Sequence, residues 1–362
     1  MKLLYIANIR MPTEKAHGVQ IMKMCEAFAA LGHEVELVVT DRKTPITEDP
    51  FAYYGVQKTF TITRLHAPDT VRFGSWGFLF ESWMFARTAA RYISRVKPDM
   101  VYGRDERVLA EIARVKIPFV WETHTGARNR AARRVLKRAK HVVAISQGLK
   151  DFYVAHGAKA ERICVAHDGV DLAAFAHTES KDGARKRLGL PLDAKVAMYI
   201  GRLDGWKGID TLLEASKLLS DAFLLAVIGG EPAQVEALSA RYPAVRFLGY
   251  RPYTELPDNQ TAADVLVLPN TGTDTVSVHY TSPLKLFSYM ASGVPLVASD
   301  LLSIREVVDE KSAILVPPDD AGRLAEGIQN AYGRNDLAQS ARSLVEKYTW
   351  SARAAAIIEC IV

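Results

Sequence analysis

The sequence predicts an α/β protein made of two doubly wound domains, each a parallel sheet covered by helices on both faces. Three observations predict this fold class. Short β-branched runs alternate with longer segments of helical spacing along the chain. The alternation restarts after the tetrapeptide Asp168-Gly169-Val170-Asp171. The chain also has 362 residues, a length that suits two domains of ordinary size.

The first half of the chain begins with a strand, a helix and a second strand. Residues 3–7 form an apolar run, residues 18–31 carry apolar side chains at helical spacing, and residues 34–40 are rich in valine. Gly32 lies where the helix should end. Crossover segments separate the further strands, which we expect at residues 100–102, 118–122, 141–145 and 163–167.

The second half repeats this pattern after a polar stretch. Residues 177–195 contain glycine, proline and many charges, which predicts a linker with one short helix. We therefore place the first domain at residues 1–172 and the second at 173–349, and expect a helix at 350–362 to pack back onto the first domain. Strands of the second domain are expected at residues 196–201, 223–229, 245–249, 265–268, 295–298 and 313–316.

Composition excludes several classes of protein. About half of the residues are hydrophobic and a quarter are charged, which is a normal globular balance, and a net charge of +5 gives no argument for a nucleic-acid partner. The N-terminal apolar run is too short for a signal peptide, and no run is long enough to span a bilayer. Three widely spaced cysteines (Cys25, Cys164, Cys360) predict no disulfide framework and fit a reducing cytoplasm.

Two long motifs lie in the second half. Residues 199–210 read Tyr-Ile-Gly-Arg-Leu-Asp-Gly-Trp-Lys-Gly-Ile-Asp, and residues 281–295 read Thr-Ser-Pro-Leu-Lys-Leu-Phe-Ser-Tyr-Met-Ala-Ser-Gly-Val-Pro. Shorter motifs are Ile-Gly-Gly at 228–230, Phe-Leu-Gly-Tyr at 247–250 and His-Asp-Gly-Val-Asp at 167–171. Together they resemble the donor-binding and hinge signatures of the large family of retaining, nucleotide-sugar-dependent glycosyltransferases with the GT-B fold (glycosyltransferase family 4-like, group 1).

The resemblance covers nearly the whole chain and is most specific in residues 163–317. It implies two Rossmann-like domains that face each other across a cleft, with the acceptor bound by the first and the nucleotide sugar by the second. In doubly wound sheets ligands bind at the carboxyl ends of the strands, which is where most of these motifs lie.

Arg202 and Lys207 are the predicted cations for the donor diphosphate. Arg202 follows the strand that ends near Gly201, and Lys207 precedes a helix. Cations there would stabilise the negative charge that grows on the departing phosphate. Without the resemblance, two solvated surface cations would be the better interpretation. The family also implies donor contacts by Gly201, Gly229, Gly249 and Tyr250, with backbone near Gly249 and Tyr250 contacting the base.

The second long motif predicts a phosphate contact at a helix start. Pro283 suits the first helical turn, and the free amides of Leu284 and Lys285 would point at an anion, with Ser282 as the alternative helix cap. Ser288 stands where the family usually has a glutamate that binds the ribose, and Tyr280 stands where an earlier glutamate is common. A serine makes a smaller ribose contact, so Ser288→Glu is expected to raise donor affinity.

Two residues of the first half match family positions. Gly18, near the start of the first helix, would let backbone approach the reacting phosphate, although a helix-start glycine explains it equally well. His124 ends the strand Trp121-Glu122-Thr123 and matches a position near the transferred sugar. We predict His124, with Arg202 and Lys207, as the catalytic group, with a partly buried structural histidine as the alternative.

Basic and aromatic side chains gather in the first half. The aromatic stretch of residues 73–85 contains three phenylalanines and two tryptophans besides Phe85. Such a combination suits an anionic membrane surface or a phosphorylated acceptor, and a solvated basic face is the alternative. The basic residues predicted to contact the membrane are Arg128, Arg130, Arg133, Arg134, Lys137 and Arg138.

The sequence thus predicts a cytoplasmic enzyme, either free or peripheral on the inner face of the membrane. It would move a sugar from a nucleotide-diphosphate sugar to a glycan or lipid-linked acceptor of cell-surface polysaccharide synthesis. Retention is implied by the resemblance. No Asp-x-Asp metal motif is present, so no metal and no cofactor are expected. The alternatives are a non-catalytic subunit that binds nucleotide sugar, a nucleotide-sugar epimerase, and a dinucleotide oxidoreductase, which the missing Gly-x-Gly-x-x-Gly disfavours.

Overall fold

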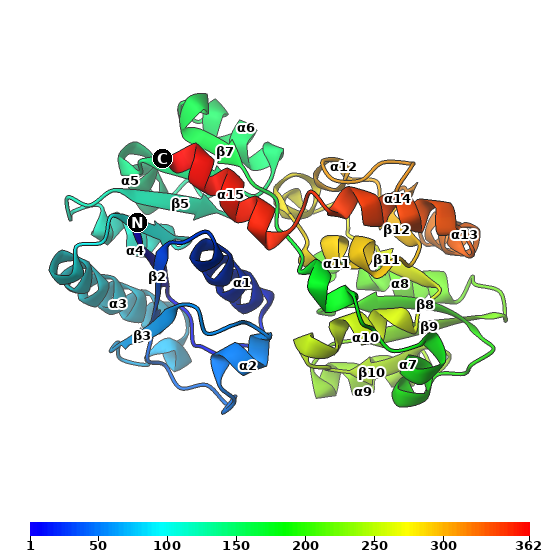
Figure 1. The fold of residues 1–362 in the computed structure, drawn as a ribbon. Helices are drawn as coiled ribbons and strands as arrows, with labels where there is room; N and C mark the ends of the chain where they lie inside the picture. Colours follow the sequence, from blue (N-terminus) through cyan, green and yellow to red (C-terminus); the bar gives the residue numbers. More distant parts are fainter. The chain divides into compact units, whose positions relative to one another are not determined.

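The computed structural model describes residues 1–362 and divides into two compact units. The N-terminal unit comprises Met1–His167 and Trp350–Val362, and the C-terminal unit comprises Asp168–Thr349. Each unit is a parallel sheet with helices on both faces (Figure 1). The predicted fold class, two doubly wound parallel-sheet domains, is confirmed. The C-terminal unit begins at Asp168, five residues before the boundary placed from the sequence pattern.

The N-terminal sheet has seven parallel strands in the order β3-β2-β1-β4-β5-β6-β7. Strand β3 was not predicted, because its residues Thr-Ile-Thr-Arg-Leu are exposed or half-buried at the sheet edge and form no apolar run. The order reverses between β1 and β4, which creates a topological switch point there. The strands are β1 (Lys2–Ala7), β2 (Glu34–Thr40), β3 (Thr61–Leu65), β4 (Met100–Gly103), β5 (Phe119–Thr123), β6 (His141–Ala144) and β7 (Ile163–Val165).

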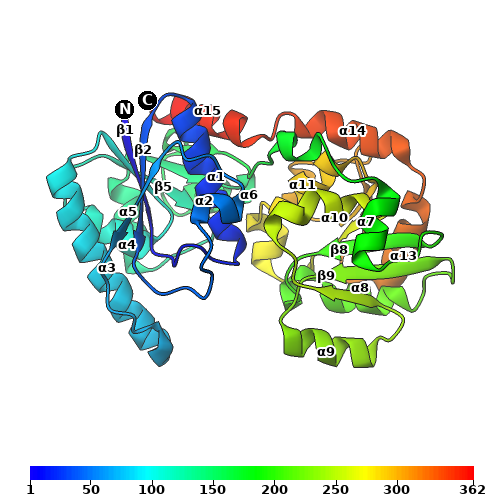
Figure 2. The same ribbon diagram turned by 60° about the horizontal axis from the view of Figure 1, so that its bottom comes forward.

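Seven helices cover this sheet. Side chains of Asp105, Asn129 and Ser146 cap the starts of α4, α5 and α6, each directly after a strand or its loop. The C-terminal helix α15 packs beside α1 (Figures 1 and 2). The helices are α1 (Ala16–Ala30), α2 (Pro50–Tyr54), α3 (Gly74–Val96), α4 (Glu106–Ile112), α5 (Arg130–Arg138), α6 (Gln147–Ala155) and α15 (Trp350–Ile361).

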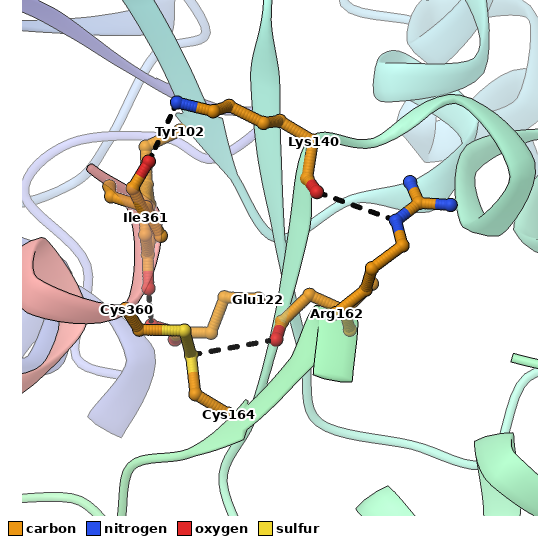
Figure 3. Close-up of a disulfide and its surroundings, with 8 residues drawn as sticks. Tyr102, Glu122, Lys140, Arg162, Cys164, Cys360 and Ile361 are labelled. Carbon is orange, nitrogen blue, oxygen red and sulfur yellow. Dashed lines mark hydrogen bonds between the residues drawn. A yellow bond between two sulfur atoms is a disulfide. The ribbon is translucent and has the colours of Figure 1, made fainter. Parts of the chain in front are cut away.

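A disulfide joins Cys164 of β7 to Cys360 of α15 (Figure 3). The prediction of no disulfide was therefore wrong. The two cysteines are separated by 196 positions, and spacing along the sequence cannot reveal that α15 returns to the edge of the first sheet. Beside the disulfide, Lys140 Nζ donates to the carbonyl of Ile361 at 2.8 Å, so a second contact holds the end of α15. Cys25 is buried and free.

The C-terminal sheet has six parallel strands in the order β10-β9-β8-β11-β12-β13, so its switch point lies between β8 and β11. A buried apolar cluster lies on each face. The strands are β8 (Lys195–Ile200), β9 (Phe223–Ile228), β10 (Arg246–Gly249), β11 (Val265–Leu268), β12 (Leu296–Ser299) and β13 (Ile314–Val316). The helices are α7 (Lys181–Leu188), α8 (Ile209–Ser216), α9 (Pro232–Arg241), α10 (Leu256–Thr261), α11 (Leu284–Ser292), α12 (Leu302–Arg305), α13 (Ala321–Ala331) and α14 (Asn335–Val345).

None of the helices combines the length and the apolar character needed to cross a membrane.

Candidate functional site

Three predicted glycines lie together at the carboxyl edge of the C-terminal sheet. Gly201 follows β8, Gly229 follows β9 and Gly249 ends β10. The amide of Gly201 donates to Ile228, and the amide of Gly229 donates to Gly249 at 2.7 Å. Gly229 has φ +120°, and a Cβ there would lie 2.0 Å from the carbonyl oxygen of Gly201. Only glycine permits this close approach of two strand ends.

A cluster of cations lies at the same edge. Arg202 lies two residues after the end of β8, and Lys207 lies in a short 3₁₀ turn, Gly205–Lys207. The ammonium of Lys285, from the first turn of α11, donates to Tyr199 Oη at 2.8 Å. A Cβ built on Gly201 would lie 2.7 Å from that ammonium, so Lys285 reaches the end of β8. The sequence predicted only the amide of Lys285 for this place, because a side chain's direction cannot be read from spacing.

The two lysines are poorly neutralised. Burial lowers the pKa of Lys207 to about 8, and the carboxylate of Asp204 opposes this shift only in part. Burial and then the neighbouring Lys207 hold the pKa of Lys285 well below its ordinary value. Asp204 also pairs with Arg202 at 2.7 Å. One carboxylate therefore faces three cations, an arrangement that favours a multiply charged anion such as a diphosphate.

Helix α11 begins at Leu284, one residue later than predicted. Pro283 is its N-cap, in extended conformation, and no side chain caps the helix. The first-turn amides of Leu284 and Lys285 therefore have no side-chain partner at this helix start. Ser282 does not cap the helix: its hydroxyl accepts from the amide of Asp168 at 2.8 Å. This bond ties the helix start to the first residue of the C-terminal unit.

Ser288 is buried, with 4% of its surface exposed. Its hydroxyl donates to the carbonyl of Lys285 and accepts from Gln260 Nε2, both at 3.0 Å. Both bonds lie within the C-terminal unit, so the serine side chain is engaged by the protein itself. The expectation that Ser288→Glu simply adds a ribose contact does not fit these surroundings, because a longer, charged side chain would displace Gln260.

Two further residues at the carboxyl edge of this sheet are Tyr250, which the sequence predicted, and Asn270, which it did not. Tyr250, predicted near the base, is 55% exposed after β10. Asn270 was missed. It follows β11, across the switch point from Arg202, and is fully buried, yet neither of its amide atoms has a hydrogen-bond partner. Buried amides normally find partners, so Asn270 is a candidate to contact a ligand.

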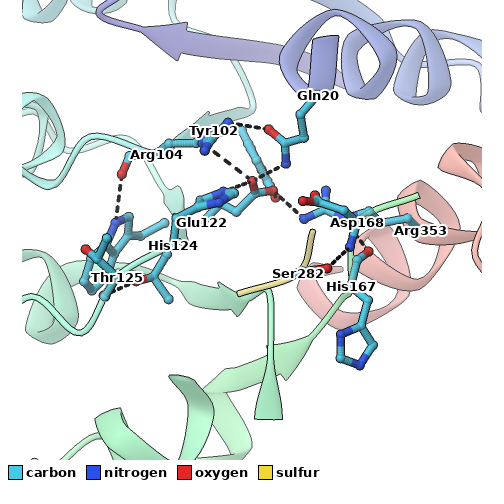
Figure 4. A network of polar contacts seen from close by, with 12 residues as sticks. Gln20, Tyr102, Arg104, Glu122, His124, Thr125, His167, Asp168, Ser282 and Arg353 are labelled. Atoms are coloured by element: carbon cyan, nitrogen blue, oxygen red, sulfur yellow. Dashed lines mark hydrogen bonds and ion pairs between the residues drawn. The ribbon is translucent and has the colours of Figure 1, made fainter. Parts of the chain in front are cut away.

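In the N-terminal unit, a buried carboxylate organises the carboxyl edge of the sheet (Figure 4). Glu122 of β5 is fully buried. Its Oε1 accepts from Gln20 and His124 at 2.6 Å, and its Oε2 accepts from Tyr102 at 2.5 Å and from Arg353 at 3.0 Å. Burial by itself would raise the pKa of Glu122, but Arg353, His124 and Arg104 hold it well below its usual range.

The ionised Glu122 fixes the state of His124. Burial, assisted by Arg104, lowers the pKa of His124 to about 4, so the imidazole is neutral near pH 7. A carboxylate only accepts, so Nε2 of His124 carries the proton and donates to Glu122. Nδ1 is then the acceptor nitrogen, able to take a hydrogen bond from a hydroxyl. His17 shares these surroundings, and burial lowers its pKa to about 3.

The sequence missed most of this network. Gln20, Arg104 and Arg353 belong to no motif, and Arg353 comes from α15, 231 residues from the carboxylate that it contacts. Gly18 has a packing role that the sequence did not predict, and its contact with the donor stays a prediction. A Cβ there would lie 2.2 Å from the hydroxyl of Tyr54, so close packing of Tyr54 requires this glycine.

Two family models match the chain. The model described as "Glycosyl transferases group 1" matches residues 194–334, and that described as "Glycosyltransferase Family 4" matches residues 17–174. Together they span most of both units. The chain belongs to the group 1 glycosyltransferases. This confirms the predicted glycosyltransferase family, whereas retention of configuration stays a prediction.

Curated relatives agree with this membership. A D-inositol 3-phosphate glycosyltransferase of Streptomyces bingchenggensis is 30% identical over 245 residues, covering 61% of this chain and 52% of that protein. A putative teichuronic acid biosynthesis glycosyltransferase, TuaC of Bacillus subtilis, is 30% identical over 249 residues, covering 64% and 60%. The chain thus spans about half to three fifths of the length of these two relatives.

Solved structures share the fold over almost the whole chain. Anabaena Alr3699/HepE in complex with UDP and glucose superposes with a TM-score of 0.79 at 18% identity, covering 99% of this chain and 98% of that one. Sucrose-phosphate synthase from Thermosynechococcus elongatus gives 0.81 at 20% identity, covering 99% and 97%. At these identities the likeness establishes the GT-B fold of this group 1 glycosyltransferase.

Proposed function

We propose that this group 1 glycosyltransferase transfers a sugar from a nucleotide-diphosphate sugar to a hydroxyl of a glycan or a lipid-linked acceptor. The observation that carries the proposal is the cation cluster of Arg202, Lys207 and Lys285 at the switch point of the C-terminal sheet, where a single carboxylate, Asp204, opposes three basic side chains. A diphosphate supplies the negative charge that this cluster lacks.

In the proposed reaction the bond between the anomeric carbon and the diphosphate oxygen breaks, and a bond to the acceptor oxygen forms on the same face of the sugar. The acceptor hydroxyl gives its proton to the departing phosphate. The two electrons of the broken bond leave with the diphosphate, so its charge grows in the transition state. The cations of the cluster and the free amides of Leu284 and Lys285 stabilise that charge, and no metal is needed.

His124 would orient the acceptor or a hydroxyl of the transferred sugar. Its neutral imidazole, held by Glu122, offers Nδ1 as a fixed hydrogen-bond acceptor. Arg353 supports this role indirectly, because it neutralises Glu122 and keeps the carboxylate ionised. We therefore assign Glu122 and Arg353 as positioning residues for His124.

The comparisons support a nucleotide-sugar donor. The Anabaena protein is described in complex with UDP-glucose, and relatives are named for an inositol phosphate and for teichuronic acid biosynthesis. We extend this to a uridine-type nucleotide sugar and to an acceptor of cell-surface polysaccharide synthesis.

We place the protein in the cytoplasm, on the inner face of an anionic membrane. The support is the basic helix α5, with four arginines and a lysine among nine residues, and the exposed aromatic side chains of α3. Such binding should weaken as salt rises, because exposed charges are screened over about 10 Å at 0.1 M.

A second candidate function is a non-catalytic subunit that binds nucleotide sugar. Ser288, and Tyr280 in the place of the earlier glutamate, favour it, because two carboxylates usual in the family are missing. Release of nucleoside diphosphate from a panel of nucleotide sugars separates the two. Release by the wild type that is lost in Lys285→Met supports transfer. Tight diphosphate binding with no release, with or without a mixture of lipid-linked and soluble acceptors, supports the non-catalytic subunit.

A further inference from the structure

A pocket lies among three helices of the N-terminal unit, away from the Glu122 network. Helices α3, α4 and α5 line this pocket, which has a volume of about 540 Å³. Leu79 and Trp83 line it from α3, Arg107 and Glu111 from α4, and Arg130 and Arg134 from α5. No part of the proposed transfer reaction uses these side chains.

The pocket has an excess of positive charge. None of its three arginines forms an ion pair. Its one carboxylate, Glu111, is already paired with Arg114 at 2.8 Å. Three guanidinium groups around one space, with a single carboxylate that is already paired, favour an anion with several acceptor oxygens, and a phosphate group is such an anion.

Exposed aromatic side chains continue from the pocket along α3. Trp83 lines the pocket and is 44% exposed, and the guanidinium of Arg87 lies 4.8 Å from its ring centre. Towards the start of the helix, Phe80 is 49% exposed, Trp76 is 84% exposed and Phe73 is 64% exposed. Large aromatic side chains are rarely left so exposed in water, and tryptophan is typical of membrane interfaces.

We propose that this pocket binds the phosphate of an anionic phospholipid head group, while Phe73, Trp76 and Phe80 enter the membrane interface. The inference rests on the proposed membrane association and makes it specific. A soluble phosphate compound would use the arginines but would leave the aromatic side chains exposed. A lipid satisfies both features at once, since its phosphate and its acyl region are joined.

The test is flotation of the full chain with vesicles of phosphatidylcholine containing phosphatidylglycerol. The test variant Arg130→Gln/Arg134→Gln removes two charges that line the pocket. The matched control, Arg133→Gln/Arg138→Gln, removes two exposed charges from the same helix that do not line it. Each basic residue near an anionic membrane raises the affinity for that membrane about fivefold by diffuse electrostatic attraction. The control variant measures how much vesicle affinity is lost with this diffuse attraction. The pocket variant is expected to lose at least about tenfold more vesicle affinity than the control variant.

A second comparison tests whether phosphate is recognised. Vesicles that carry the same negative charge as oleate should bind the wild type several-fold more weakly than phosphatidylglycerol vesicles, and Trp83→Ala should reduce this preference. Equal losses in the two double variants, equal binding to oleate vesicles, or no vesicle binding by the wild type would each overturn the proposal. Nucleoside diphosphate binding, measured on every variant, reports separately on the donor site and on folding.

Discussion

The carboxyl edges of the two sheets differ in how far their buried charges are neutralised. In the N-terminal unit, Glu122 accepts four hydrogen bonds, and Arg353 and Arg104 lie within ion-pair distance of it. In the C-terminal unit, Lys207 and Lys285 are held near each other with only Asp204 to oppose them. A polar network whose members are all hydrogen-bonded to one another stabilises the fold and orients its side chains. A cluster with excess positive charge is suited instead to bind an anionic ligand.

The largest effect should come from breaking the satisfied network. Arg353→Met leaves Glu122 buried without its nearest charged partner, and losing one member of a buried ion pair costs roughly 3–5 kcal/mol of folding free energy. Chemical denaturation would measure it. Arg342→Met, on the exposed surface of α14, is the control and should change stability little. A stable Arg353→Met protein would mean that Glu122 becomes protonated or hydrated without cost.

Removing a cation from the unsatisfied cluster should have the opposite signature. Lys207→Ala is expected to keep or raise stability, because a lysine that burial partly deprotonates is a cost to the native state. It should weaken nucleoside diphosphate binding by about 10- to 100-fold, the equivalent of one charge-assisted hydrogen bond at roughly 1.5–3 kcal/mol. Nucleoside binding, measured by calorimetry in parallel, should hardly change. Equal losses for nucleoside and nucleoside diphosphate would contradict the assignment of Lys207 to phosphate.

Ser288 tests whether the ribose side of this cluster is open. Since Gln260 and the carbonyl of Lys285 already engage the hydroxyl, Ser288→Glu should bury a carboxylate and destabilise the fold by about 1–3 kcal/mol. Ser288→Ala, the control, should cost only about 1 kcal/mol. Thermal unfolding with and without nucleoside diphosphate separates stability from affinity. A glutamate variant that is stable and binds more tightly would restore the original expectation of a ribose contact.

What the sequence could predict follows from how each feature is encoded. Strand–helix alternation is local, so the fold class and twelve of the thirteen strands could be predicted from the pattern alone, and only the edge strand β3 was missed. Contacts between distant segments are not local. Arg353 on Glu122, Cys360 on Cys164 and the ammonium of Lys285 at the end of β8 depend on tertiary packing. The motifs identified the family and the glycines of the donor edge, but not the side chains that surround them.

The protonation of Lys207 gives a pH-dependent prediction. Its pKa in the free protein is about 8, so the ammonium that binds phosphate is lost as pH rises through 8. Diphosphate affinity should fall above that pH, by at most about tenfold per unit for one proton. Lys207→Arg, which stays charged, should reduce this slope. The stability of the free protein should change in the other direction and rise between pH 8 and the ordinary lysine pKa. In that range Lys207 is neutral in the folded protein, so the cost of burying its ammonium is removed.

The smallest effect is expected at Arg202, although the sequence ranked it with Lys207. The Arg202 side chain is 71% exposed and already pairs with Asp204, so solvent screens most of its charge. Arg202→Ala should therefore weaken diphosphate binding only a few-fold, about 0.2–1 kcal/mol, as is typical of exposed pairs. Raising the salt concentration should shrink the difference in diphosphate affinity between wild type and variant.

Asp204→Asn provides the matched test. Because it removes the one carboxylate opposing the cluster, it should strengthen diphosphate binding if the cluster carries excess positive charge. If Arg202→Ala costs as much as Lys207→Ala, then Arg202 turns inward when the donor binds, and its exposed position belongs to the ligand-free protein alone.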